Sequence, residues 1–263
     1  MMTFDDTCRT VQDVQGHKTL LLSFSRGKDS LAAFLRCYES GLWDRFILIH
    51  MSMLDLSFFG YLNYFRSRYP DVTIVDIMEP SMNTRRNALV LQTPLGVVAM
   101  SQTYMEIGPF SPYKWTDLER YIKEDYNLTP ETLTGVGIKM VDSPMRRLAI
   151  SKNGSIAMNR LKWYPVADLT DAEVGALIKR HNLKLPRDYE YWGRTFDGFD
   201  YYFLKYIFEN LPKDLQKIRE EYPLIDLVYS RREHYFGTLI KKRRFQYEKY
   251  GLQVISQYEE EKK

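Results

Sequence analysis

The residues with the clearest chemical potential lie in one short segment, residues 25–30 (SRGKDS), between an apolar run and a helical pattern. A tight loop of this kind can bind an anion, because the first backbone N–H groups of a helix lack intrahelical partners and the helix dipole attracts negative charge. Gly27 lets the backbone approach a phosphate without an intervening Cβ, and Lys28 adds a compact positive charge. We therefore predict that a phosphate-bearing ligand binds this loop and its flanks, through Ser23, Phe24, Ser25, Arg26, Gly27, Lys28, Asp29 and Ser30.

The loop differs from two common nucleotide-binding fingerprints. A Walker A loop needs glycine where Leu22 stands, and serine or threonine where Asp29 stands. A dinucleotide fingerprint begins at Gly135 and Gly137, but its third glycine would fall at Met140. Neither fingerprint therefore accounts for the loop.

The elements that must position this loop alternate in type along the first half of the chain. Apolar runs predict strands at residues 19–24, 46–51, 72–78 and 132–138. Helical patterns and capping signals predict helices through residues 31–38 and 58–69, after Thr116 and after Ser143. This order predicts an α/β fold with a Rossmann-like, mostly parallel sheet and helices on both faces. Ligands of such sheets bind beyond the carboxyl ends of the strands, so we expect the loops after the first and fourth strands to form the site.

The second half of the chain is predicted to be a helical C-terminal portion. A second capping box begins at Thr170, and helical stretches follow it at residues 202–210, 214–221 and 224–242. We expect three parts: an N-terminal segment (1–16), an α/β nucleotide-binding domain (17–165) and the helical portion (166–263) packed on it. Many of the 20 tyrosines lie in residues 189–206, where a lid over a bound nucleotide could sit.

Three segments, in this order, resemble the phosphoadenosine phosphosulfate (PAPS) reductase family of the PP-loop ATP pyrophosphatase superfamily. The first is residues 20–34 (LLLSFSRGKDSLAAF), which contain the PP-loop pattern S-x-G-x-D-S. The second is residues 137–146 (GIKMVDSPMR), which match the family pattern G-x-[R/K]-x-x-[E/D]-S-x-x-R. The third begins at residues 164–174 (YPVADLTDAEV) and continues to Gly193 and Arg194. Together they cover about the first 200 residues, and they imply a fold of the Rossmann-like HUP type.

The resemblance implies an ATP-dependent reaction. Loops that read G-K-D-S are expected to hold the β,γ-pyrophosphate of ATP while an oxygen of an acceptor substrate attacks the α-phosphate. This step forms an adenylate and releases pyrophosphate. It needs positive charge on the departing pyrophosphate, supplied by loop N–H groups, Lys28 and Mg²⁺. The implied activity is therefore that of an adenylyltransferase-type ATP pyrophosphatase that uses ATP and Mg²⁺, with an acceptor that the sequence does not identify.

The second motif is expected to complete the site. Its cationic residues would bind phosphates or an anionic substrate, and Asp142 would orient them or hold Mg²⁺ together with Asp29. His50 ends the second strand, where this fold places nucleotide contacts. The expected catalytic residues are Lys28, Asp29, Lys139 and Arg146. The further nucleotide-binding candidates outside the loop are His50, Gly137, Asp142, Arg147 and Arg194.

The cysteines separate the chain from the reductases that it resembles. Family reductases use a cysteine near the C-terminus, whereas the two cysteines here are Cys8 and Cys37. A sulfonucleotide reductase is therefore an alternative that requires one of these thiols as nucleophile. A second alternative is a module that binds nucleotide or nucleic acid without turnover, because basic residues gather at 241–244 (KKRR), after Arg231 and Arg232.

Composition excludes several other classes. Charged residues make up 27% of the chain and the net charge is +3, which is too small a bias to indicate a nucleic-acid or membrane partner by itself. Two cysteines in 263 residues, with no CxxC, exclude a disulfide scaffold and cysteine-ligated zinc or iron–sulfur sites. The longest apolar runs are about six residues, and the N-terminus lacks an apolar leader region. We therefore expect a cytoplasmic protein without a membrane segment, and the sequence indicates no particular oligomeric state.

Overall fold

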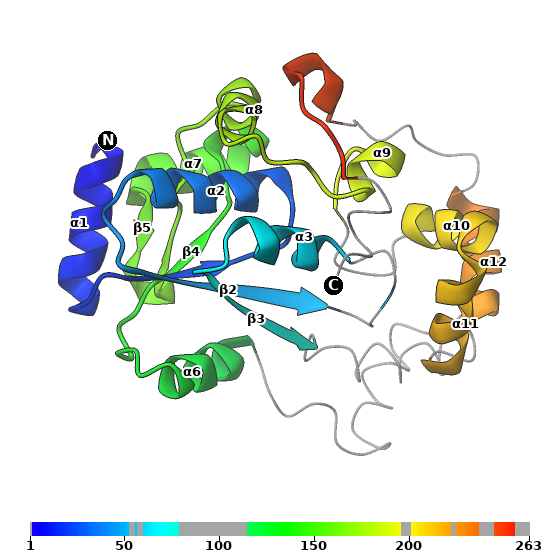
Figure 1. Ribbon diagram of the computed structural model, residues 1–263, viewed down its shortest axis with the longest axis horizontal. Coiled ribbons are helices and arrows are strands. Elements are labelled where there is room, and N and C mark those ends of the chain that lie inside the picture. The colour runs from blue at the N-terminus through cyan, green and yellow to red at the C-terminus, as the bar shows by residue number, and fades with distance from the viewer. Residues whose placement is uncertain are drawn as a thin grey trace.

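The computed structural model describes residues 2–52, 56, 60–78, 115–195, 201–221, 225–236 and 245–255. At its centre is a six-stranded sheet in the order β3-β2-β1-β4-β6-β5 (Figure 1). The strands are β1 (Thr19–Ser23), β2 (Arg45–Ser52), β3 (Thr73–Met78), β4 (Thr134–Val136), β5 (Ile156–Ala157) and β6 (Lys162–Trp163). All neighbours pair in parallel except β5, which is antiparallel to β6. The predicted Rossmann-like, mostly parallel sheet is therefore confirmed.

Helices cover both faces of this sheet, because successive residues of a buried strand point to opposite sides. Leu20 and Leu22 of β1 belong to a core shared with α1 (Phe4–Gln15), α2 (Lys28–Glu39), α3 (Tyr61–Arg68) and α8 (Asp171–Arg180). Leu21, between them, packs on the opposite face with Ile122 of α6 (Trp115–Asp125). Figure 1 shows α2, α3 and α8 above the sheet and α6 below it.

The loops predicted to form the site follow neighbouring strands. β1 pairs with β2 on one side and β4 on the other, so that Ser23 lies opposite both Ile49 and Val136. The carboxyl ends of β1 and β4 therefore meet, and the loops that leave them lie side by side. β4 is shorter than the expected strand 132–138, because the chain turns where the Ile138 N–H donates to the Val136 carbonyl (2.8 Å). After the turn come the 3-10 helix η2 (Met140–Asp142), α7 (Pro144–Asn153) and, between β5 and β6, η3 (Met158–Arg160).

Helix starts largely follow the predicted capping signals. The Ser143 side chain caps α7, and a proline occupies the first turn. Thr170 caps α8 in a reciprocal capping box with Glu173. The cap predicted at Thr116 is wrong, because α6 already includes Trp115 and the threonine therefore lies inside the first turn.

The C-terminal portion packs in two places. α8 joins the core of the sheet, and the last described segment returns to it through a parallel bridge between Leu185 and Val254. That segment contains the 3-10 helix η4 (Tyr247–Tyr250), which lies near α9 (Asp188–Trp192). Three helices surround a separate apolar cluster to one side of the sheet in Figure 1: α10 (Tyr201–Asn210), α11 (Pro212–Glu221) and α12 (Ile225–Phe236).

Two expectations can be compared with the structure only over the residues that it describes. The helix expected over 224–242 is described from Ile225 to Phe236, and its remaining residues lie outside the described part. Within the described ranges, no helix combines the length and apolar character needed to cross a bilayer.

Candidate functional site

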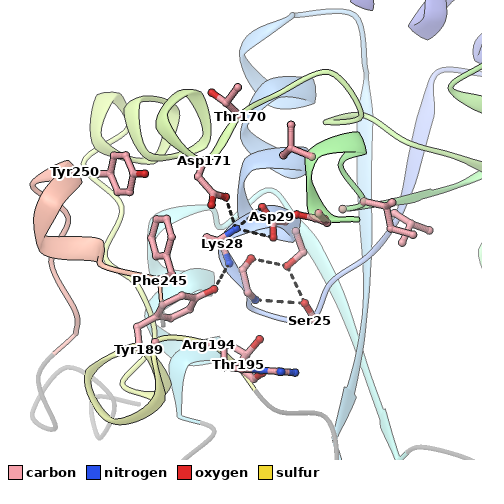
Figure 2. A pocket seen from close by; sticks show the side chains of 18 of the residues that line it. Ser25, Lys28, Asp29, Thr170, Asp171, Tyr189, Arg194, Thr195, Phe245 and Tyr250 are labelled. Carbon is pink, nitrogen blue, oxygen red and sulfur yellow. Dashed lines mark hydrogen bonds and ion pairs between the residues drawn. The ribbon is translucent and has the colours of Figure 1, made fainter. Parts of the chain in front are cut away.

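A pocket of about 1100 Å³ lies at the carboxyl ends of β1 and β4, where the sequence predicted a ligand (Figure 2). Its walls come from the loop after β1, the turn after β4, the start of α8, the end of α9 and the segment around η4. The predicted residues that line it are Ser23, Ser25, Gly27, Lys28, Asp29, Ser30, Gly137, Asp142, Arg146 and Arg194. Those that lie outside its lining are Phe24, Arg26, His50, Lys139 and Arg147.

The loop after β1 is held in shape by its own hydroxyl groups. Ser30 Oγ donates to the Gly27 carbonyl (2.9 Å), and Ser25 Oγ donates to Ser30 Oγ (3.3 Å). Gly27 is the N-cap of α2, and a Cβ there would lie 2.9 Å from Thr195 Oγ1. Arg26, just before it, has a φ of 63°, a left-handed conformation that is uncommon for residues with a side chain. The loop conformation therefore requires a glycine at position 27, and the left-handed backbone at Arg26 must be stabilised by contacts from other segments.

A buried polar network beneath the loop supplies that support. Arg26 is 2% exposed, its Nε donates to His50 Nε2 (3.0 Å), and its terminal nitrogen pairs with Asp188 (3.3 Å). His50 Nδ1 lies 2.8 Å from Asp76 Oδ1. Because a guanidinium can only donate, His50 Nε2 accepts, and the ring proton lies on Nδ1 toward Asp76. Burial lowers the pKa of His50 and the Arg26 charge adds to this, against the opposing effect of Asp76, so the neutral ring is favoured.

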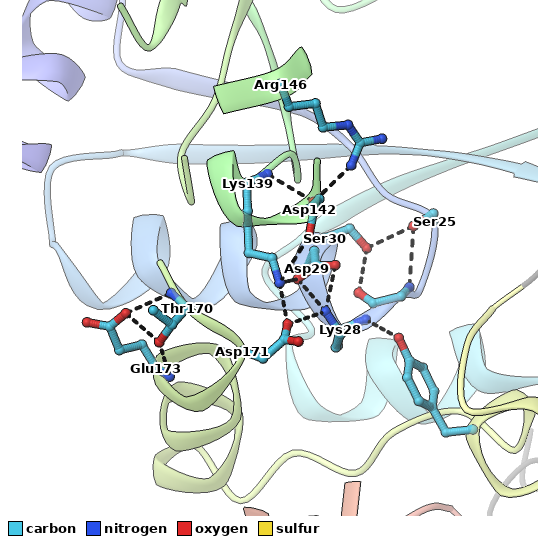
Figure 3. Close-up of polar contacts among 12 residues, drawn as sticks. Ser25, Lys28, Asp29, Ser30, Lys139, Asp142, Arg146, Thr170, Asp171 and Glu173 are labelled. Carbon is cyan, nitrogen blue, oxygen red and sulfur yellow. Dashed lines mark hydrogen bonds and ion pairs between the residues drawn. The ribbon is translucent and has the colours of Figure 1, made fainter. Parts of the chain in front are cut away.

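Two ammonium groups meet at the start of α2 (Figure 3). Lys28 Nζ lies 2.9 Å from both carboxylate oxygens of Asp29 and 2.9 Å from Asp171 Oδ1. Lys139, from the turn after β4, reaches the same two carboxylates, with its Nζ 2.8 Å from Asp29 Oδ1 and 2.5 Å from Asp171 Oδ1. The side chains of Lys28 and Lys139 are 13% and 0% exposed. The loops after β1 and β4 are thus joined by shared ion pairs.

The charges of this cluster stabilise one another. Burial disfavours the charged form of Lys139, but the Asp29 and Asp171 carboxylates outweigh that effect and raise its pKa. Burial also raises the pKa of Asp171, but hydrogen bonds from Lys139 and Lys28 outweigh it and lower the pKa to about 2. Lys139 and Asp171 therefore both stay ionised near neutral pH. Fixed charges held in place before a ligand arrives are the arrangement that stabilises developing negative charge most effectively.

The second motif contributes a close backbone contact and a second ion pair. A Cβ on Gly137 would lie 2.7 Å from backbone atoms at the start of α2, so the turn after β4 touches the loop directly. Asp142 accepts from the Lys139 backbone N–H (3.2 Å) and from the Arg146 guanidinium (2.8 Å). Arg146 lines the pocket and is half exposed, whereas Arg147 is exposed outside it.

Several pocket residues were not predicted as functional. The Tyr189 hydroxyl accepts a hydrogen bond from the Lys28 backbone N–H (2.7 Å). The Phe245 ring centroid lies 5.0 Å from Lys28 Nζ, and the ring stacks on Tyr250 at 5.2 Å with an interplanar angle of 10° (Figure 2). Asp171 lies in the third resembling segment, where its sequence context indicated only a helix start. Phe245 and Tyr250 belong to no motif, so sequence spacing gave no signal for them. Tyr189 begins the Tyr-rich stretch in which a lid was expected, but no role was predicted for the residue itself.

The remaining predicted residues are spread around the pocket. Phe24 is buried in the apolar core, with its ring centroid 4.8 Å from that of Phe65. Arg194 lines the pocket, and its Nε donates to the Thr195 carbonyl (3.2 Å). The basic run 241–244, on which the nucleic-acid alternative depends, lies outside the described residues.

The predicted magnesium ligands flank the lysine cluster. Asp29 and Asp142 approach Lys139 Nζ at 2.8 and 3.5 Å. Among the residues that the structure describes, no three His, Cys, Asp or Glu side chains are arranged to hold a metal by themselves. Mg²⁺ is usually bound by one or two carboxylates that share it with substrate phosphates and water. The hard oxygens of Asp29 and Asp142 at the edge of the pocket suit that mode.

The cysteines lie away from this chemistry. Cys8 and Cys37 are fully buried, and neither lines the pocket. Burial raises the pKa of the Cys37 thiol, and its hydrogen bond with Cys8 raises it further. Both properties disfavour the thiolate, which is the reactive form of cysteine.

Comparison with known proteins gives a distant structural likeness. No family model matches the sequence, and no curated protein matches it. Among solved structures, the NH3-dependent NAD synthetase from Campylobacter jejuni, in complex with nitrate ion, aligns with a TM-score of 0.40 and 14% sequence identity. The alignment covers 92% of this chain and 97% of that one. A likeness of this degree is too distant to assign a function.

Proposed function

We propose that this chain is an ATP-dependent PP-loop enzyme that adenylates an acceptor substrate and releases pyrophosphate. The observation that carries the proposal is the meeting of Lys28 and Lys139 on shared carboxylates at the start of α2. The two lysines come from separate segments that resemble one family, and both are largely buried at the helix end where anions bind most favourably. This arrangement supports binding of a polyphosphate.

In the proposed reaction, the β,γ-pyrophosphate of ATP binds against the loop after β1. The start of α2 and Lys28 neutralise its charge, and Arg146 approaches from the other wall of the pocket. An oxygen of the acceptor bonds to the α-phosphorus, the bond from that phosphorus to the bridging oxygen breaks, and the electron pair leaves on pyrophosphate. Asp29 and Asp142 would hold Mg²⁺, which when bound offsets negative charge on the phosphates.

The sulfonucleotide reductase alternative has less support. Reduction of that kind requires a thiolate at the reacting group, and both thiols of the chain are buried outside the pocket. A binding module without turnover shares the pocket with the proposed enzyme. Product analysis distinguishes it, because such a module would bind ATP and release nothing.

The first test measures ATP binding, since turnover needs the acceptor. Isothermal titration of the full chain with ATP and Mg²⁺ should give binding that Lys28→Ala and Lys139→Met each weaken at least about tenfold, as loss of a charged phosphate contact would. Lys152→Met, at an exposed position on α7, is the matched control and should bind as wild type does. Equal binding in all four proteins would contradict the proposal.

The second test identifies the products. The protein is incubated with ATP labelled at the α- or γ-phosphate, together with a small-molecule extract as the source of acceptor. The proposal expects AMP or an AMP ester together with pyrophosphate, and loss of both in Lys28→Ala. Release of ADP and phosphate would refute adenylation, and binding without any product would favour the non-catalytic module.

A further inference from the structure

The ammonium group of Lys139 is enclosed by acidic side chains. Its side chain is 0% exposed, and Nζ contacts Asp171 at 2.5 Å, Asp29 at 2.8 Å and Asp142 at 3.5 Å. These three acids line the pocket, whereas Lys139 does not. A ligand in the pocket can therefore touch Lys139 only if one of the carboxylates gives way.

The three carboxylates differ in how firmly they are held. Asp29 is 25% exposed and lies at the start of α2, where both its oxygens bond Lys28. Asp142 is 23% exposed and also bonds Arg146. The Asp171 side chain is the most exposed of the three side chains, at 40%. Asp171 stands in the first turn of α8 and lines the pocket, and because its side chain is partly exposed, a rotation of that side chain can carry the carboxylate into solvent.

The position of the Asp171 carboxylate is also the position that an anion would take. Asp171 Oδ1 lies 2.9 Å from Lys28 Nζ and 2.5 Å from Lys139 Nζ, so one oxygen bridges two ammonium groups (Figure 3). Phosphate oxygens bind lysines at the same distances. The low pKa of Asp171 agrees with a carboxylate held in a strongly anion-favouring place.

We propose that Asp171 is an internal counter-ion that occupies an anion subsite between Lys28 and Lys139, and that a di- or polyphosphate ligand binds by displacing it. The inference rests on the proposed function and deepens it. A competing carboxylate lowers the affinity for every anion, but a ligand with several negative charges recovers more from the two lysines than a singly charged one does. Asp171 thus sets how much binding energy an anion must supply to enter the subsite, and a polyphosphate has more charge with which to supply it.

The test uses inorganic pyrophosphate, without divalent cation, titrated into the full chain by calorimetry. Asp171→Asn keeps the shape and an acceptor oxygen but removes the charge. We expect it to bind pyrophosphate roughly tenfold more tightly than wild type, with a smaller gain for inorganic phosphate. Glu173→Gln removes the same charge two residues along α8 and should leave affinity unchanged. Among the described residues, the Glu173 side chain bonds only Thr170.

The outcomes separate this inference from the proposed function. Tighter binding in Asp171→Asn that disappears in the double variant Lys139→Met/Asp171→Asn supports displacement. Unchanged or weaker binding in Asp171→Asn, with wild type binding normally, overturns the inference and leaves Asp171 as a support for Lys139. Absence of pyrophosphate binding in wild type overturns the proposed function and this inference with it. If Asp171→Asn fails to fold, Asp171→Ser, which also removes the charge, is measured under the same criteria.

Discussion

The substitution Gly137→Ala tests whether the turn after β4 sets the geometry of the nucleotide loop. A Cβ at this position would lie 2.7 Å from the Asp29 carbonyl carbon and 2.7 Å from the Ser30 nitrogen. Ordinary contacts begin at 3.4 Å, so the two backbones must separate by about 0.7 Å. The obstructing atoms belong to the first turn of α2, which cannot rotate away as a side chain would.

Two consequences follow from a shift of that size. Overpacking of this kind reduces the free energy of unfolding by about 1–3 kcal/mol, which urea denaturation followed by circular dichroism measures. The shift also moves the start of α2 relative to Lys139, and a misplacement near 1 Å can cost about a hundredfold in function. We therefore expect Gly137→Ala to lose ATP affinity by at least about tenfold, measured by isothermal titration.

Gly135→Ala separates the two consequences. Its Cβ would meet side chains, with Leu22 Cδ1 at 2.8 Å and Trp163 Nε1 at 3.2 Å, and not the loop backbone. It should therefore destabilise the fold by a similar amount and retain most of the ATP affinity. If Gly137→Ala binds ATP within about twofold of wild type, or if both variants lose affinity equally, the close approach of Gly137 is not what shapes the site.

Two further predictions concern the buried network beneath the loop. Asp188→Asn removes the carboxylate that pairs with Arg26, and both side chains are at most 2% exposed. The substitution should lower the free energy of unfolding, measured by urea denaturation, by about 3–5 kcal/mol. A loss below about 1 kcal/mol would contradict a role for this pair in stability. His50 has a pKa below its ordinary 6.5, chiefly because it is buried, so on acidification the unfolded chain takes up the proton first. The free energy of unfolding should therefore fall as pH decreases from about 6.5 toward the lower folded-state pKa, and His50→Gln should flatten this slope; a rise in stability over that window would refute the assignment.

Much of the site was predictable because the anion-binding loop is formed by residues that are adjacent in sequence. The loop from Ser25 to Ser30 lies within one strand–loop–helix unit, so its role as an anion site follows from a glycine, a lysine and a helix start that are adjacent in sequence. The first four strands and their mostly parallel pairing followed from buried apolar runs in alternation with helices. Strands β5 and β6 were missed because each has two residues and exists only through pairing, such as that between Gly135 and Trp163.

The rest of the site depends on contacts that no local pattern encodes. Tyr189 reaches the loop across 161 positions of sequence, and Asp171 reaches Lys28 across 143. Arg26 and His50 were assigned to the ligand because of their place in the loop and at a strand end. Both are buried in the structure, where the Arg26 guanidinium bridges the His50 imidazole and the Asp188 carboxylate. These contacts hold Arg26 in its left-handed backbone conformation. Only the tertiary structure distinguishes a side chain beneath a loop from one above it.

The charge arrangement explains why the three resembling segments belong together. Two ammonium groups brought into one partly buried place would repel each other, and each would lose hydration. The structure avoids both costs by pairing each lysine with acids from other segments: Lys139 of the second motif with Asp29 of the first, and both lysines with Asp171 of the third. No one segment could hold its charges in this geometry alone. A change to Lys28, Asp29, Lys139 or Asp171 should therefore alter how the other three contribute to anion binding. The effects of these substitutions on binding free energy should be strongly non-additive in double-mutant cycles.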